Sequence, residues 1–141
     1  MAPDRAILLP AVAMVLVTVG VWLRMYSDRL TEIRERRIHP QKLANARQAG
    51  ELLQNTQASD HLKNLFEMPV LFYALCGYIA FTGLTTWFLL ACAWGFVVLR
   101  AMHAYIHLSS NTVIRRFQAY VASTVVLFVM WGVFAVRLFE G

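Results

Sequence analysis

Three long runs without a charged residue constrain the fold of this chain more than any other feature. The longest run, residues 68–99, contains 32 residues. As one helix it would be roughly 48 Å long, well beyond the roughly 30 Å hydrocarbon core of a bilayer. The run is therefore expected to fold back on itself. Residues 82–86 form the predicted turn, because glycine and β-branched threonine weaken a helix.

The other two runs each match the length of one membrane-crossing helix. Residues 6–23 give 18 uncharged residues and residues 117–136 give 20, close to the roughly 20 that span a bilayer. A cleaved signal peptide is the alternative for the first run. That run is longer than a typical signal core, and no small-residue cleavage site follows it, so a permanent anchor is expected.

The composition agrees with a membrane protein. Hydrophobic residues make up 59% of the chain, whereas soluble domains have roughly 45–50%. We therefore predict an all-α integral membrane protein, a single domain over residues 1–141 with four transmembrane helices in one bundle. The four spans are expected at about 6–26, 62–81, 85–107 and 116–138. Spans two and three include polar flanking residues, because their apolar parts alone are too short to cross the membrane.

The basic residues predict how the chain is oriented. Of the 13 Lys and Arg residues, 11 lie in or beside the loops at about 27–59 and 108–114: Arg24, Arg29, Arg34, Arg36, Arg37, Lys42, Arg47, Lys63, Arg100, Arg115 and Arg116. The positive-inside rule then puts both loops in the cytoplasm and both termini outside. A nucleic-acid partner is not predicted, because topology already explains the basic run at residues 34–37.

Polar residues recur at helical spacing near the cytoplasmic ends of three predicted spans. They are Lys63, Asn64 and Glu67 on the second, Arg100, His103 and His107 on the third, and Arg116 with Tyr120 on the fourth. One reading is that they only join the helices by hydrogen bonds. However, four cations in or beside this set face one acid, Glu67: Lys63, Arg100, Arg115 and Arg116. A half-buried surplus of positive charge favours an anionic ligand, with an apolar partner entering from lipid.

These polar motifs resemble those of the membrane-associated proteins in eicosanoid and glutathione metabolism, the MAPEG family, in particular its small bacterial members. The resemblance rests on the segment 63–69, Lys-Asn-Leu-Phe-Glu-Met-Pro, on Arg-Ala-Met-His at 100–103, and on Arg116 followed four residues later by Tyr120. It implies a four-helix bundle in the bacterial inner membrane, a homotrimer, and glutathione bound between subunits near the cytoplasmic face.

The resemblance also implies a role for each polar residue. Asn64 and Glu67, with Lys63 beside them, would bind the polar parts of glutathione, and Arg100 and His103 would support that network. Arg116 and Tyr120 would lie nearest the thiol. A guanidinium stabilises a thiolate, the form that attacks electrophiles. The implied activity is a glutathione-dependent transferase or peroxidase acting on lipophilic electrophiles. Arg115 is the alternative to Arg116 if the helix register shifts by one.

Two rival readings stay open. His103 and His107 share a helix face and could bind a metal or haem, although two ligands on one helix do not close a site. Cys76 and Cys92 lie inside apolar runs and form no CxxC pair, so no metal site is predicted from them. The second rival is a non-catalytic bundle of the same fold that binds lipid or another ligand.

Overall fold

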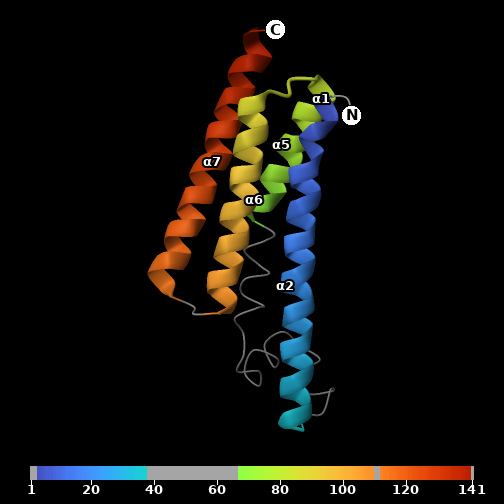
Figure 1. The fold of residues 1–141 in the computed structure, drawn as a ribbon, viewed down its shortest axis with the longest axis vertical. Coiled ribbons are helices and arrows are strands. Elements are labelled where there is room, and N and C mark those ends of the chain that lie inside the picture. The colour runs from blue at the N-terminus through green and yellow to red at the C-terminus, as the bar shows by residue number, and fades with distance from the viewer. Residues whose placement is uncertain (1–2, 38–66, 110–111, 141) are drawn as a thin grey trace.

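The computed structural model describes residues 3–37, 67–109 and 112–140, and all of its regular elements are helices. In chain order these are α1 (Pro3–Ala6), α2 (Leu8–Glu35), α5 (Met68–Thr82), α6 (Trp87–Leu108) and α7 (Val113–Glu140). The four longer helices run alternately up and down, and the two termini lie at the same end of the bundle (Figure 1). The predicted four-helix bundle is therefore confirmed.

Ile7 separates α1 from α2, and Pro10 lies in the first turn of α2. Pro10 has no backbone N–H, so it cannot donate the helical hydrogen bond that would reach the carbonyl of Ala6. The helix is interrupted at Ile7 and then continues without a break to Glu35. The C-terminal part of α2 projects beyond the other helices (Figure 1). The sequence predicts this extension, because helix-forming residues follow Arg29. Within α2, Arg24 forms an ion pair at 2.9 Å with Asp28, one helical turn away.

The predicted turn at residues 82–86 is confirmed. Gly83 ends α5 in the left-handed conformation with φ of 70°, which glycine adopts without steric cost. Thr86 then caps α6, and its side-chain oxygen accepts a hydrogen bond from the Leu89 amide at 3.2 Å. Pro69 is the second residue of α5 and lies in its first turn, where a missing backbone N–H is tolerated.

Replacing Gly83 by alanine should lower the free energy of unfolding by about 1–2 kcal/mol, because an L residue pays that cost in the left-handed region. Thermal unfolding of the detergent-purified protein measures the loss. Gly77→Ala is the matched control: it lies within α5, and a Cβ there would meet nothing within 4 Å. Equal losses in the two variants would contradict this role for Gly83.

The bundle interior is built from residues at helical spacing on each helix. Its main members are Met14 and Val21 on α2, Phe72, Leu75, Cys76 and Ile79 on α5, Leu89, Ala93 and Phe96 on α6, and Leu127, Met130 and Phe134 on α7. Phe72 stacks on Phe96, with ring centroids 4.4 Å apart. Helices α6 and α7 make the most extensive contact in the described bundle. Both carry small buried residues, Ala104 on α6 and Ala119 on α7, of the kind that allow helices to pack closely.

The outward faces of the helices are also apolar. Large exposed side chains include Leu16 on α2, Phe81 on α5 and Phe128 on α7. Helices that are hydrophobic on all sides belong in a membrane. Three of them, α2, α6 and α7, are long and apolar enough to cross one. The chain is thus an integral membrane protein.

The second span is the shortest helix of the bundle. With 15 residues, α5 is roughly 22 Å long. The polar flank that is expected to complete this span, residues 62–66, lies outside the described residues. The sequence also predicts an interruption of the first helix at residues 39–40, a short polar helix at 41–54 and a helix cap at 59 or 60, and these too lie outside the described residues.

The fourth span begins earlier than expected. Its helix, α7, begins at Val113 rather than near residue 116, so Arg115 and Arg116 both lie within its first turn.

Candidate functional site

Two polar side chains of α6 point into the bundle. Arg100 is 0% exposed and His103 is 2% exposed, and their spacing of three places them on one helix face. Burial of a guanidinium is unfavourable unless other groups compensate its charge and bind its N–H donors. Among the residues that the structure describes, the Tyr120 phenol and the Glu67 carboxylate lie within electrostatic range of Arg100. The interior of the bundle is therefore polar at this level.

His103 joins α6 to the first turn of α7. Its ring nitrogen Nδ1 lies 2.9 Å from the backbone carbonyl of Arg116. Because a carbonyl only accepts, Nδ1 must carry the hydrogen in this bond. The Arg116 amide in turn donates to the Thr112 carbonyl at 3.0 Å. A side chain of α6 is thus hydrogen-bonded to the backbone of the first turn of α7 at Arg116.

Tyr120 lies one turn further along α7 and contacts both α6 side chains. The guanidinium carbon of Arg100 lies 5.6 Å from the centroid of the Tyr120 ring, over its face, which is a cation–π arrangement. The His103 and Tyr120 ring centroids are 6.0 Å apart. The hydroxyls of Ser123 and Thr124 donate to the Tyr120 carbonyl at 2.8 and 2.9 Å. Side chain and backbone of Tyr120 are both held.

These residues line a hollow between α6 and α7, which we call the α6–α7 hollow. It has a volume of about 240 Å³ and is formed by His103, Val113, Arg116, Phe117 and Tyr120. Arg116 and Tyr120 supply polar groups, whereas Val113 and Phe117 supply apolar walls. Phe117 is 65% exposed on the outer surface of the bundle. The hollow thus combines polar groups with an apolar rim of two exposed side chains, Val113 and Phe117.

The electrostatics of this hollow favour an anion. The first turn of α7 carries Arg115 and Arg116 and no acidic residue. The N-terminal end of a helix adds a partial positive charge of its own. Arg116 is half-buried and lines the hollow, whereas Arg115 is exposed and is not among its lining residues. The geometry therefore favours Arg116 over Arg115.

The remaining residues expected in the site are placed as follows. Glu67 is exposed at the start of α5, within electrostatic range of Arg100. Lys63 and Asn64 lie outside the described residues, so their expected positions stay predictions. The same holds for the side chain of His107, and with it for the metal or haem reading.

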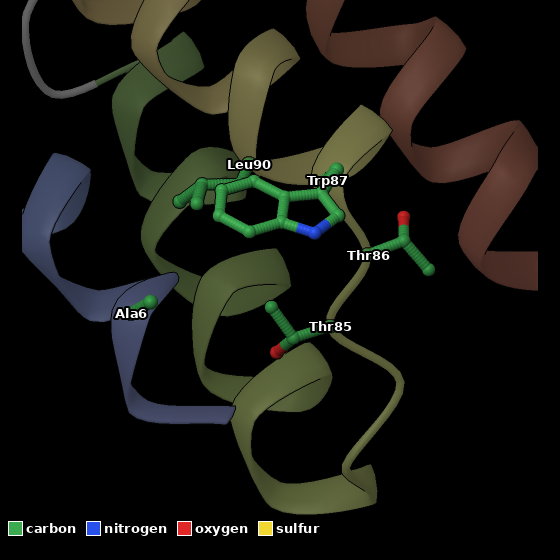
Figure 2. Close-up of a pocket in the computed structure, with 5 residues that line it drawn as sticks. All are labelled: Ala6, Thr85, Thr86, Trp87 and Leu90. Atoms are coloured by element: carbon green, nitrogen blue, oxygen red, sulfur yellow. The ribbon is translucent and has the colours of Figure 1, made fainter. Parts of the chain in front are cut away.

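A second pocket lies at the opposite end of the bundle, beside the termini. It has a volume of about 340 Å³ and is lined by Ala6, Thr85, Thr86, Trp87 and Leu90. Figure 2 shows Trp87 and Leu90 on the α6 side of this pocket and Ala6 on the N-terminal segment. None of these lining residues is charged, so an acidic ligand would gain no ion pair from them. The α6–α7 hollow is the better candidate site.

Val113 and Phe117 were not among the site residues expected from the sequence. The signal that identifies them is their spacing on α7, since residues 113, 116, 117 and 120 fall on one face at intervals of three and four. They are recognised as site residues once the helix is known to begin at Val113.

Comparison with known proteins gives one match. The family model described as "MAPEG family" matches residues 7–136, nearly the whole chain and all four long helices of the bundle. No curated protein and no solved structure matches the chain.

Proposed function

Because the chain belongs to the MAPEG family, the membrane-associated proteins in eicosanoid and glutathione metabolism, we propose that it is a membrane-embedded, glutathione-dependent transferase or peroxidase. Family membership supports glutathione-related chemistry of this type at the level of the family. The observation that carries the proposal to this chain is the α6–α7 hollow, where Arg116 and Tyr120 lie beside an apolar rim.

The groups in the hollow suit activation of a thiol. A free thiol has a pKa near 8.5, and a guanidinium together with the positive end of α7 would stabilise its thiolate. A guanidinium does not act as a base at neutral pH, so the role of Arg116 is electrostatic. The Tyr120 hydroxyl would donate a hydrogen bond to the sulfur. Together they would keep glutathione in its nucleophilic form.

The apolar rim indicates the class of the second substrate. Phe117 and Val113 are exposed on the outer surface of the bundle, so a lipophilic electrophile in the membrane would reach the hollow without crossing water. In the transferase reaction the thiolate attacks the electrophilic carbon, a C–S bond forms, and the leaving group departs with the electron pair. In the peroxidase reaction two glutathione molecules reduce a lipid hydroperoxide to an alcohol and water and leave as the disulfide.

We propose that the functional unit is a homotrimer. Sites for small molecules have volumes of roughly 300–1,000 Å³. The α6–α7 hollow offers about 240 Å³, which supports a site completed by a neighbouring subunit. Glu67, with Lys63 and Asn64 shortly before it in the sequence, would bind the amino and main-chain groups of glutathione. His103 forms part of the lining of the hollow, and Arg100 lies behind it.

The orientation we propose puts the hollow at the cytoplasmic side of a bacterial inner membrane. The hollow lies at the end of the bundle away from both termini (Figure 1). In the sequence, 11 of the 13 basic residues lie in or beside the loops at about 27–59 and 108–114, which the positive-inside rule puts in the cytoplasm. Glutathione is then drawn from the cytoplasm, the electrophile comes from the lipid, and the whole chain of residues 1–141 acts as one domain.

Calorimetric titration of the detergent-purified protein with glutathione tests the proposal. We expect saturable binding at millimolar concentration or below, and Glu67→Gln should raise Kd about tenfold or more, because a hydrogen bond to a charged group is lost. Glu35→Gln, at the far end of α2, is the matched control and should leave Kd unchanged. If the wild-type protein shows no saturable binding, the non-catalytic bundle becomes the better reading.

A further inference from the structure

The α6–α7 hollow is supported by polar side chains that lie behind the residues exposed in it. Arg100 is fully buried and is not among the lining residues, yet its guanidinium lies over the face of the Tyr120 ring. His103 reaches the floor of the hollow, but its Nδ1–H is used for the Arg116 carbonyl. Each of these α6 residues therefore contacts one of the α7 residues that would act on the thiol.

We propose that Arg100 and His103 are positioning residues: the His103 hydrogen bond fixes Arg116, and the Arg100 cation–π contact fixes Tyr120. This rests on the function proposed above, and it assigns the two residues a role other than direct binding of glutathione. The first turn of a helix lacks some of its backbone hydrogen bonds and frays easily. A side chain from the neighbouring helix holds that turn in place.

The two contacts act at different points of α7. The bond from His103 is to the backbone at Arg116, so it determines where the helix begins relative to α6. The contact from Arg100 is to the ring of Tyr120, whose backbone is separately held by Ser123 and Thr124. Arg100 therefore selects the side-chain rotamer, while His103 sets the helix position. A misplacement of about 1 Å at a reacting group lowers a rate by as much as about a hundredfold.

Hydrogen–deuterium exchange on the ligand-free protein tests the His103 contact. His103→Leu should raise exchange of the amides between residues 113 and 120 by about fivefold or more, because one hydrogen bond that restrains the turn is lost. His103→Asn keeps an N–H donor close to the position of Nδ1 but removes the ring, so exchange should return nearly to the wild-type value. Gln118→Ala, exposed on the same turn, is the control. Unchanged exchange in His103→Leu would overturn the proposal.

Kinetics separate positioning from ligand contact. Arg100→Lys keeps the positive charge but loses the flat guanidinium that covers the Tyr120 ring. We expect kcat for conjugation to fall about ten- to hundredfold, with KM for glutathione changed less than about threefold. His103→Asn should restore most of the kcat that His103→Leu loses. A rise in Kd equal to the loss of rate would mean that these residues bind glutathione directly, and would overturn the positioning role.

The two measurements keep the two proposals separate. If wild-type protein fails to bind glutathione, the proposed function is wrong, and measurements on the ligand-free protein then decide whether Arg100 and His103 hold α7. Exchange decides for His103. For Arg100, whose contact is to the Tyr120 ring, a double-mutant cycle of Arg100→Lys and Tyr120→Leu in thermal unfolding decides: the loss of stability in the double variant should be smaller than the sum of the two single losses. Additive losses would overturn the Arg100 contact.

Discussion

Replacing Arg116 by leucine should lower kcat for conjugation by about a hundred- to a thousandfold. This is the usual effect of removing one group that stabilises a negative charge in an active site. Arg116 lines the α6–α7 hollow from the first turn of α7. Under the proposed function, the thiolate of glutathione would lose its main counter-charge without this guanidinium. Turnover of a lipophilic aryl chloride measures the rate, and the ultraviolet absorbance of the bound thiolate should fall with it.

Arg115→Leu is the matched control for this prediction. It removes the same charge from the same helical turn, but Arg115 is exposed and outside the lining of the hollow. We expect its kcat to stay within about threefold of wild type, since an exposed charge is largely screened by solvent. Comparable losses in the two variants would show that the turn acts through its total charge, and would contradict the specific role of Arg116.

The fold could be predicted because charge and length leave few arrangements open. An uncharged run of 32 residues must turn back within a bilayer, and Gly83 with the threonines beside it identifies where. The start of α7 was predicted less well, because the boundary was drawn at the arginines. Charged residues mark the edge of the membrane. The hydrogen-bonded backbone of α7 extends past the arginines toward the N-terminus, through Ile114 to Val113. The break at Ile7 follows from Pro10, whose effect on the preceding carbonyl is local.

The site could be predicted only as a set of helix faces. Spacing puts Arg100 and His103 on one side of α6, but it does not say which helix covers that side. Only the packed bundle reveals that α7 covers it, so that Arg100 is buried behind Tyr120 while Arg116 lines the hollow. Whether a residue is buried depends on which helix packs against it. For this reason the spacing of Arg100 and His103 alone is compatible both with binding a ligand and with supporting other residues.

The Phe72–Phe96 stack is the other contact whose loss should have a large effect. Phe72 on α5 is 0% exposed, and the centroid of its ring lies 4.4 Å from the ring centroid of Phe96 on α6. Phe96 precedes Arg100 by one helical turn, so this stack supports the level of the bundle at which the site lies. The α5 and α6 backbones are spaced further apart than those of α6 and α7, and the two rings fill the space between them.

Phe72→Ala should lower the free energy of unfolding by about 3 kcal/mol, the lower end of the range for a buried phenylalanine, because in lipid the lost packing counts more than transfer from water. Phe81→Ala is the matched control: it lies on the same helix but is 91% exposed, so we expect a change within about 0.5 kcal/mol. Thermal and denaturant unfolding in one detergent measure both. Conjugation activity of Phe72→Ala should fall at a lower temperature than that of wild type, because α6 loses support one turn from Arg100. If Phe81→Ala destabilises the protein as much as Phe72→Ala does, α5 is held by its outer face, and the stack does not support the site.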